Sequence, residues 1–342
     1  MLIVDDSALV RNLLTKILNS YNSIEVVGTA ADPYIARALI KALDPDVITL
    51  DIQMPRMDGL TFLRNLMRLR PTPVVMISAL TQRGAESTLR SLALGAVDFI
   101  SKPEAGSAIG LESYAEEIFN KVVSASQVCF DPAEGIKKFG ELDTDPDAQL
   151  CGTVASRKIV AIGASTGGTE AIKAVVHDLP ESTPAIVITQ HLPVAFSQSF
   201  SNHVDAVSGM SAHLAKEGQT VLQGNIYIAP GDRHLEIERQ SGCFVCRLQN
   251  GPKVNRHKPS VDVMFDSLAA SAGEDAIGIL LSGMGKDGAQ GMKKMFDAGA
   301  TTIIQDQYSS VVWGMPGEAQ KLNCVQHTVP LDQVASTILE NI

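Results

Sequence analysis

The sequence predicts an α/β protein of two domains, each built on a doubly wound parallel sheet. Its 342 residues exceed what one hydrophobic core usually fills, so about two domains are expected. Short apolar runs alternate with segments of helical periodicity, as in strand–helix units. Between Ser124 and Ser156 this pattern gives way to turn-forming and charged residues. We therefore expect a first domain at 1–123, a linker at 124–156 and a second domain at 157–342.

Composition narrows the class of protein. With 45% hydrophobic and 19% charged residues, the chain can bury large cores. No apolar run approaches the ~20 residues of a membrane span, so direct membrane insertion is not expected. The net charge of −10 argues against nucleic acid as a partner, because no basic stripe is available to meet phosphates. The N-terminus does not resemble a secretory signal and the five cysteines are scattered, which favours a cytoplasmic protein.

Five strands alternate with helices in the first domain. The predicted strands are 2–4, 24–30, 46–50, 73–77 and 97–100. The predicted helices begin at Ser7, an N-cap type of residue, and continue with 33–43, 60–69, 83–94 and an ambiguous amphipathic segment at 109–123. Strict alternation with short links implies a parallel sheet with helices on both faces.

Polar residues follow these strands, where a doubly wound sheet binds its ligands. They are Asp5, Asp6, Asp51, Ser78 and Lys102. Three carboxylates repel one another unless a hard cation such as Mg²⁺ lies among them. A lysine and a hydroxyl at the same edge would suit an acyl phosphate on one carboxylate. Solvated strand-end charges are the alternative, which the convergence of five residues disfavours.

The first domain resembles a response-regulator receiver. The stretches that carry the resemblance are D-D after the first strand, D-I-Q-M-P-R-M-D-G-L around Asp51 and K-P after the fifth strand. It implies a flavodoxin-like fold in which Asp51 accepts a phosphoryl group from a histidine kinase. It further implies that Asp5, Asp6 and Asp51, with the main-chain carbonyl of Gln53, hold Mg²⁺.

Three other receiver positions have implied roles. Ser78 and Lys102 would contact the phosphoryl oxygens, and Phe99 would be the aromatic switch residue. One departure from the family's pattern is that the first strand begins at Met1, a few residues short of the usual start. This puts the given start of the chain, and the stability of the domain, in question.

The second domain opens on K-I-V-A-I-G-A-S-T-G-G, residues 158–168. Ile159–Gly163 is an apolar run typical of a buried parallel strand. Gly163-x-Ser165-x-Gly167 fits the nucleophile elbow, in which a serine is exposed at the end of a strand. The same residues also suit a phosphate-binding loop or a plain tight turn.

Three residues just past predicted strands can form a catalytic triad. Ser165 follows the strand above, His191 follows a strand at 185–189, and Asp287 lies shortly after a strand at 276–281. Parallel strands share one carboxyl edge, so these residues can meet as nucleophile, general base and orienting acid. A dinucleotide loop would instead expect an acidic residue near the end of the next strand, where Gln190 and His191 stand. This favours the elbow.

Residues 157–340 resemble the catalytic domain of the chemotaxis protein-glutamate methylesterase (CheB) family. The matching stretches are G-A-S-T-G-G-T-E-A-I, T-Q-H-L-P, Y-I-A-P-G-D-R-H, G-P-K-V-N-R-H-K-P-S-V-D-V-M-F, L-S-G-M-G-K-D-G-A-Q-G-M and V-W-G-M-P-G-E-A. The resemblance implies a serine hydrolase with Ser165, His191 and Asp287 as its triad. The main-chain N–H of Met284 would be the oxyanion donor, and Thr166 is a candidate helper. No cofactor is expected for the esterase chemistry.

The expected activity is hydrolysis of glutamyl methyl esters on chemoreceptors, with release of methanol, and deamidation of receptor glutamines. The unphosphorylated receiver would inhibit the hydrolase until Asp51 is phosphorylated. Arg256, His257 and Lys258 form a basic cluster that would either meet an acidic receptor helix or be a solvated loop. Two other classes stay open: a non-enzymatic adaptor with the same fold, and a nicotinamide-binding enzyme.

Overall fold

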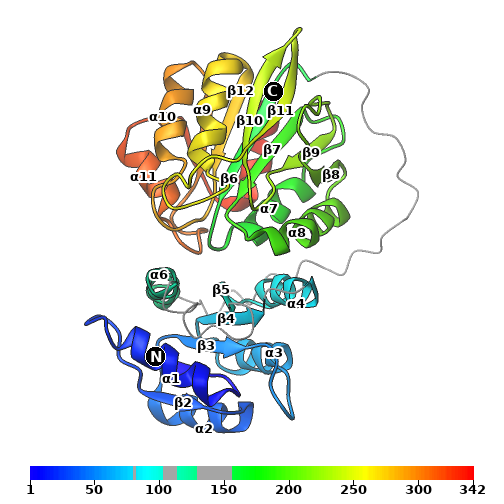
Figure 1. Cartoon of the computed structure of the whole chain (residues 1–342). Helices are drawn as coiled ribbons and strands as arrows, with labels where there is room; N and C mark the ends of the chain where they lie inside the picture. The colour runs from blue at the N-terminus through cyan, green and yellow to red at the C-terminus, as the bar shows by residue number, and fades with distance from the viewer. Residues whose placement is uncertain (80–81, 103–113, 129–155) are drawn as a thin grey trace. The chain divides into compact units, whose positions relative to one another are not determined.

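The computed structural model describes residues 1–79, 82–102, 114–128 and 156–342, apart from the side chains of residues 78, 79, 82 and 83. The chain divides into two compact units, Met1–Phe139 and Gly140–Ile342, and each is described by itself (Figure 1). The predicted linker lies largely outside the described residues, as does a short helix predicted at 133–139. The domain boundaries therefore stay a prediction.

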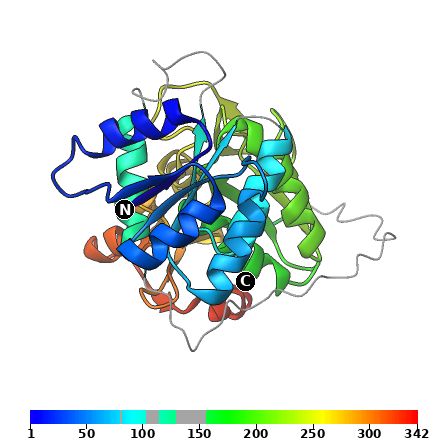
Figure 2. The same ribbon diagram turned by 90° about the horizontal axis from the view of Figure 1, so that it is seen from below.

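The first unit is a parallel sheet of order β2-β1-β3-β4-β5 with helices against both faces (Figure 2). Its strands are β1 (Leu2–Val4), β2 (Gly28–Ala30), β3 (Ile48–Asp51), β4 (Val74–Ala79) and β5 (Asp98–Lys102). Its helices are α1 (Ala8–Leu18), α2 (Pro33–Leu43), α3 (Gly59–Leu69), α4 (Gln82–Ala93) and α6 (Ala115–Ser126). Helix α1 packs against α6, and α3 against α4. This confirms the flavodoxin-like order, with its switch point between β1 and β3.

Helices α1 and α2 of this unit begin where the sequence provides a cap. Ser7 accepts a hydrogen bond from the N–H of Val10 (3.5 Å) at the start of α1. Asp32 accepts bonds from the N–H groups of Tyr34 and Ile35 (both 2.9 Å) at the start of α2. These side chains satisfy donors that have no partner within the helix, which fixes where each helix begins.

Two predicted elements differ in extent from the structure. The strand predicted at 24–30 is wrong at its start, because only Gly28–Ala30 pairs, as β2. Its partner β1 has three residues, paired from Leu2↔Gly28 to Val4↔Ala30, so no longer strand can form there. Ile24 and Val26 pack instead against the core as partly buried side chains. Helix α6 extends to Ser126, beyond the predicted end at 123, and residues 109–113 lie outside the described part.

The short first strand is nevertheless fully part of the unit's core. Leu2, Ile3 and Val4 are fully buried, and β1 pairs with strands on both sides. The Met1 ammonium donates to the carbonyl of Glu25 (2.7 Å), which anchors the beginning of the chain.

The second unit contains a seven-stranded parallel sheet of order β14-β13-β12-β6-β7-β9-β8 and a two-stranded hairpin, β10–β11. The strands are β6 (Ile159–Ala164), β7 (Ala185–Gln190), β8 (Ser211–Leu214), β9 (Asn225–Ile228), β10 (His234–Gln240), β11 (Cys243–Gln249), β12 (Ala276–Leu280), β13 (Thr301–Gln305) and β14 (His327–Val329). The helices are α7 (Gly168–His177), α8 (Val194–Val207), α9 (Val261–Ser271), α10 (Ala289–Asp297), α11 (Met315–Lys321) and α12 (Val334–Glu340). Helices α9 and α10 pack together, and α7 packs against α8 and α12.

The register of the central strands brings the predicted triad loops together. Strand β6 lies between β12 and β7, and the chain leaves it on one side to β7 and returns on the other at β12. Gly163 is opposite both Leu280 and Thr189, and Ala164 is opposite Gln190. The residues after β6 and β7 are therefore neighbours, and they lie beside the switch point between β6 and β12, where such sheets bind ligands.

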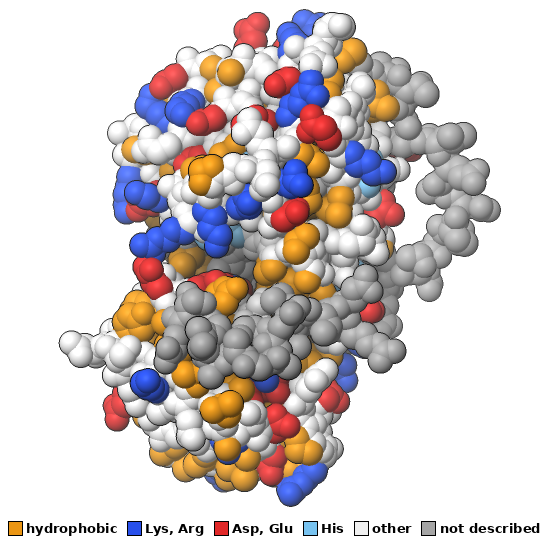
Figure 3. All heavy atoms as spheres, in the orientation of Figure 1, with side chains coloured by type: hydrophobic (Ala, Val, Ile, Leu, Met, Phe, Trp, Pro, Cys, Tyr) orange, Lys and Arg blue, Asp and Glu red, His pale blue; other side chains and the backbone are white. Residues whose placement is uncertain are grey.

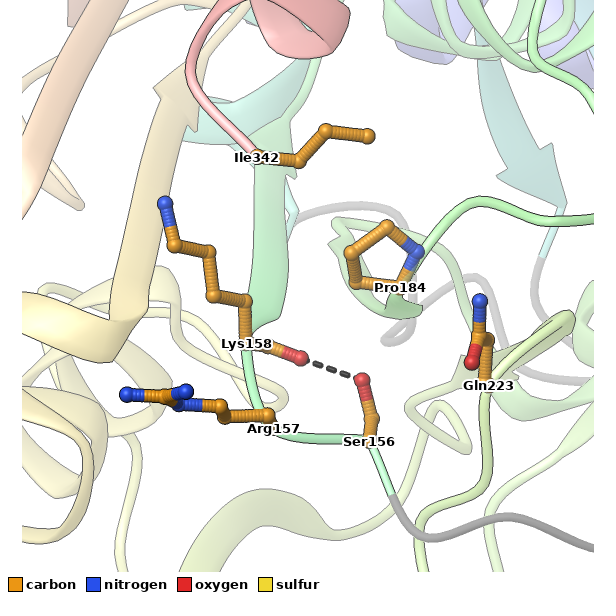
Figure 4. Close-up of a pocket in the computed structure, with 6 residues that line it drawn as sticks. All are labelled: Ser156, Arg157, Lys158, Pro184, Gln223 and Ile342. Carbon is orange, nitrogen blue, oxygen red and sulfur yellow. Dashed lines mark hydrogen bonds between the residues drawn. The ribbon is translucent and has the colours of Figure 1, made fainter.

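The opposite edge of this sheet has a shallow cavity of about 290 Å³ (Figure 4). It is lined by Ser156, Arg157, Lys158, Pro184, Gln223 and Ile342. These residues lie around the amino ends of β6 and β7, so the cavity is not at the carboxyl edge where Ser165 stands.

Among the described residues, no helix has the length and apolar character needed to cross a membrane.

Candidate active site

Ser165 is the first residue after β6, and its main chain is held on three sides. Its N–H donates to the carbonyl of Ser282 (3.0 Å). Its own carbonyl accepts from the N–H of Gly168 (2.8 Å) and from Nε2 of Gln190 (2.9 Å). Gly167 has a φ of +77°, whereas Ser165 is not among the described non-glycine residues with positive φ. The sharp turn is therefore made by Gly167, where a side chain would be strained, and not by the serine.

His191 is the first residue after β7 and lies beside Ser165 in the register. Its main-chain N–H donates to the carbonyl of Ala164 (3.2 Å), and its side chain is 6% exposed. Nε2 is 2.8 Å from Oδ2 of Asp287. Because a carboxylate only accepts, Nε2 carries the proton and Nδ1 carries the lone pair. Within the described part of the chain, Nδ1 has no hydrogen-bond partner, so it is the nitrogen left to accept a proton.

Asp287 is 1% exposed and is surrounded by hydrogen-bond donors. The donors are Nε2 of His191 (2.8 Å), Oγ of Ser260 (2.7 Å), Nδ2 of Asn255 (2.8 Å) and the N–H groups of Val261 (2.7 Å) and Asp262 (3.3 Å). Burial by itself would raise the pKa of Asp287, but the bonds from His191, Asn255 and Ser260 outweigh it and hold the pKa below its ordinary value. The group is a fixed negative charge beside His191.

Sequence reasoning missed several residues that build this site. Asn255 bridges Asp287 and Asp262, and the His257 ring stacks on the His191 ring at 3.7 Å between centroids. His234 accepts the N–H of Ser260 on Nδ1 (3.1 Å) and so holds that residue beside Asp287. The stretch N-R-H-K-P-S-V-D contains most of these residues, but its charges drew attention only to a basic cluster. Of that cluster, His257 lies within the site, and Lys258 bonds Oδ1 of Asn250 (3.0 Å).

The two predicted helper residues lie close to Ser165. A Cβ added to Gly283 would be 2.9 Å from Cβ of Ser165 and 2.3 Å from Sδ of Met315, so only glycine permits this approach. Met284, the predicted oxyanion donor, follows directly. Thr166 is 6% exposed, and its carbonyl accepts from Oγ of Ser282 (2.8 Å). The catalytic roles of Met284 and Thr166 remain predictions.

The carboxyl edge of the first unit's sheet brings three predicted carboxylates and a lysine together. One oxygen from each of Asp5, Asp6 and Asp51 lies within 4.8 Å of the others. Nζ of Lys102 is 2.9 Å from Oδ2 of Asp5 and 2.9 Å from Oδ1 of Asp51. This all-oxygen, strongly negative donor set fits the ligand preference of Mg²⁺.

Asp51 is 3% exposed and has few donors for its charge. Burial raises its pKa to about 6, against the lowering effect of the Lys102 ammonium and of a main-chain hydrogen bond from Gln53. Because burial disfavours the charged form, a further cation at this edge would stabilise the Asp51 carboxylate. The role of the Gln53 carbonyl as a metal ligand remains a prediction.

The two remaining predicted residues of this unit, Ser78 and Phe99, are described to different extents. The backbone of Ser78 lies in β4, opposite Ser101, but its side chain lies outside the described residues. Phe99 is 3% exposed, and Nζ of Lys121 donates to its carbonyl (2.6 Å) and lies 4.9 Å from the ring centroid. In this structure the predicted switch residue is therefore buried.

Both units of the chain are similar to known protein families. A family model described as CheB methylesterase matches residues 160–338, and one described as response regulator receiver domain matches 1–110. A protein-glutamate methylesterase/protein-glutamine glutaminase 1 of Xanthomonas euvesicatoria pv. vesicatoria is 53% identical over 99% of this chain and 96% of the relative. One named protein-glutamate methylesterase/protein-glutamine glutaminase 2, of Saccharophagus degradans, is 50% identical over 100% of this chain and 98% of its own length.

A solved structure covers the second unit. The CheB methylesterase catalytic domain of Thermotoga maritima has 35% sequence identity and a TM-score of 0.54, over 55% of this chain and 100% of that domain. Together these similarities extend over nearly the whole chain and both of its units. The chain belongs to the CheB methylesterase family, in the form that also has a response-regulator receiver domain.

Proposed function

We propose that this chain is a phosphorylation-regulated protein-glutamate methylesterase of chemotaxis that also deamidates protein glutamines. The observation that carries the proposal is the edge at which Ser165 and His191 follow neighbouring strands, with Nε2 of His191 bonded to the buried Asp287. The relatives' names, protein-glutamate methylesterase/protein-glutamine glutaminase, supply the substrate class.

Ester hydrolysis would proceed in two steps. Oγ of Ser165 attacks the carbonyl carbon of the glutamyl ester while Nδ1 of His191 takes the hydroxyl proton. The carbon–methoxy bond then breaks, and His191 returns the proton to the departing methanol. Water attacks the acyl-enzyme with His191 again as the base, and the products are a glutamate carboxylate and free Ser165. Asp287 stays ionised and stabilises the imidazolium in both steps.

The developing oxyanion requires a donor beside Ser165. The close approach of Gly283 to Ser165 supports the main-chain N–H of Met284 in that role, and Thr166 as its helper. Deamidation uses the same path, except that the amide carbon–nitrogen bond breaks and ammonia leaves with the proton from His191.

The receiver edge would regulate this reaction. Asp51 accepts a phosphoryl group from a histidine kinase, with Ser78 and Lys102 contacting the phosphoryl oxygens and Phe99 as the switch residue. Asp5, Asp6 and Asp51, with the Gln53 carbonyl, would hold Mg²⁺, which neutralises the charge that develops on the transferring phosphoryl group. Phosphorylation would relieve an inhibition that the receiver imposes on the hydrolase, by changing the relative stability of two arrangements.

The substrates would be chemoreceptor helices that carry glutamyl esters. Figure 3 shows Lys and Arg side chains gathered beside a histidine on the visible face of the second unit. Arg256, exposed on the turn that reaches His191, is the residue of the predicted basic cluster best placed to meet an acidic helix. Among the described residues, Cys243, Cys246 and Cys324 are free thiols, as expected in a reducing compartment, so we propose that the enzyme acts in the cytoplasm.

The test is methanol release from methylated receptor membranes. Ser165→Ala should lower the release by on the order of 10⁴–10⁶-fold, the range found when a triad serine is removed. Release that persists at the wild-type rate in this variant would rule out the serine mechanism. An active-site serine probe separates the enzyme from a non-enzymatic adaptor, and a cofactor titration tests the nicotinamide alternative.

A further inference from the structure

The loop between β11 and α9 contains a tight turn that contacts two members of the triad. Val254 and His257 exchange both main-chain hydrogen bonds (3.0 and 2.8 Å), which closes a two-residue hairpin. The two residues between them, Asn255 and Arg256, have φ values of +48° and +71°. Asparagine tolerates this conformation well, whereas an arginine adopts it only when surrounding contacts hold it there.

The first of these contacts joins Asn255 to two buried carboxylates. Its Nδ2 donates to Oδ2 of Asp262 (2.6 Å) and to Oδ1 of Asp287 (2.8 Å). Asp262 is 8% exposed and Asp287 is 1% exposed. Burial raises the pKa of Asp262, and the nearby charge of Asp287 adds to this. An amide NH₂ group has two donor hydrogens and no charge, so it can hold both carboxylates at fixed separation.

The second contact places His257 against the base. The rings of His257 and His191 are stacked, with centroids 3.7 Å apart and planes 5° apart. The bond from Nε2 to Asp287 fixes one edge of the His191 ring, and the stacked ring fixes the tilt of its plane. The remaining edge presents Nδ1, the nitrogen that must accept the proton of Ser165.

We propose that Asn255 and His257 are positioning residues of the esterase: Asn255 sets the Asp287 carboxylate, and His257 sets the plane of the His191 ring. One turn thereby aligns the acid and the base together. This inference rests on the proposed function, because it assigns the turn a role in that reaction. Asn255 acts through Asp287 and His257 acts through the His191 ring, so both are positioning residues.

The experiment measures the rate at which a fluorophosphonate probe labels Ser165 in the full chain. The probe reads the nucleophile and base alone, because Oγ attacks phosphorus and fluoride leaves, with no receptor required. His257→Ala should slow labelling on the order of 10–100-fold, the penalty expected for a misaligned catalytic group. His257→Phe keeps a stacked ring and should restore most of the rate.

Asn255 is tested by a variant that keeps the turn. Asn255→Gly accepts the positive φ but has no amide donors, so it should fold and label on the order of 10-fold or more slowly. Lys253→Ala, an exposed neighbour just before the turn, is the control and should label at the wild-type rate. With receptor membranes, the His257→Ala and Asn255→Gly variants should lose kcat while KM stays within about 2-fold, because alignment of the triad does not bind substrate.

Two results would overturn the proposed roles of the turn residues. His257→Phe as slow as His257→Ala would overturn the role of the stacked ring, and Asn255→Gly labelling at the wild-type rate would overturn the role of the amide. These results are distinct from failure of the proposed function. If the proposed function failed, the probe would still label Ser165 in the wild type and label the turn variants more slowly. Methylated receptors, however, would release no methanol.

Discussion

Two buried aspartates, Asp51 and Asp287, stand at equivalent places in the two units. Each lies at or just past the carboxyl end of a parallel strand beside the switch point of its sheet, and they are 3% and 1% exposed. Their pKa values nevertheless move in opposite directions. The pKa of Asp51 is raised to about 6, whereas that of Asp287 is held below its ordinary value.

The difference lies in the number of donors and not in burial. Asp287 receives hydrogen bonds from five groups of the protein itself. Asp51 has the Lys102 ammonium, which it shares with Asp5, and a main-chain hydrogen bond from Gln53. A carboxylate saturated with donors is a permanent charge, suited to orienting a base. A buried carboxylate with few donors is stabilised by an added cation, and covalent modification removes its uncompensated charge. Both properties suit a phosphoryl acceptor.

The largest expected effect is the loss of esterase activity when Asp287, the carboxylate with five donors, is substituted. Asp287→Asn should lower kcat for methanol release on the order of 10⁴-fold, because an amide can donate to His191 and favours the wrong tautomer. The measurement is methanol release from receptor membranes, with folding checked by circular dichroism. A loss below about 10-fold would mean that His191 does not depend on the charge of Asp287.

The second effect separates the two units. Asp51→Asn should abolish the rise in methanol release caused by a small-molecule phosphodonor, because an amide cannot form the acyl phosphate. Labelling of Ser165 by the fluorophosphonate probe reports in parallel on the state of the triad. Stimulation that survives in this variant would show that the donor acts at another residue.

The pH dependence of Mg²⁺ binding should expose the raised pKa of Asp51. Below pH about 6 the carboxylate is protonated, so Mg²⁺ affinity should fall by up to about tenfold per pH unit. Calorimetric titration of the full chain at pH 5.0, 6.0 and 7.5 measures this, with Asp51→Asn as control. Affinity that stays constant over this range would contradict the raised pKa.

Stability should respond to pH with opposite signs at the two aspartates. The pKa of Asp51 is raised from 3.8, so the folded state binds the extra proton, and this group destabilises the receiver as pH rises from about 4 to 6, by roughly 1–3 kcal/mol. The pKa of Asp287 is lowered from 3.8, so its stabilising contribution is present above that pH and is lost as pH falls. Thermal unfolding without Mg²⁺, compared with Asp51→Asn and Asp287→Asn, measures both trends. Matching signs would contradict the comparison.

The smallest effect tests the saturation of Asp287. Ser260→Ala removes one donor and leaves four, so it should cost about 1 kcal/mol of stability and a few-fold in kcat. Thermal unfolding and methanol release provide the two readings. A loss as large as that of Asp287→Asn would mean that Ser260 is not one donor among several.

The sequence predicted the parts of both sites that follow a strand. Ser165, His191 and Asp51 could be predicted because an apolar run ends at each of them, and parallel strands share their carboxyl edge. The pairing of His191 with Asp287 followed from the same argument and agrees with the observed bond.

The role of Asn255 and the contact of His257 with the triad were not predicted, because they depend on a turn without strand or helix periodicity. Asn255 and His257 reach the triad through backbone with positive φ, which no hydrophobic pattern encodes. The true extent of β2 was missed for a similar reason, because its length is set by its partner β1 and not by its own apolar residues.

The central claim is that the Ser165 chemistry and the Asp51 switch belong to one regulated esterase. The most direct measurement is methanol release from methylated receptor membranes with Mg²⁺, before and after a small-molecule phosphodonor, for the wild type and for Ser165→Ala. The account predicts release by the wild type that increases with the donor, and none above background from Ser165→Ala in either condition. Release by Ser165→Ala, or a wild type that releases no methanol with or without the donor, would contradict it.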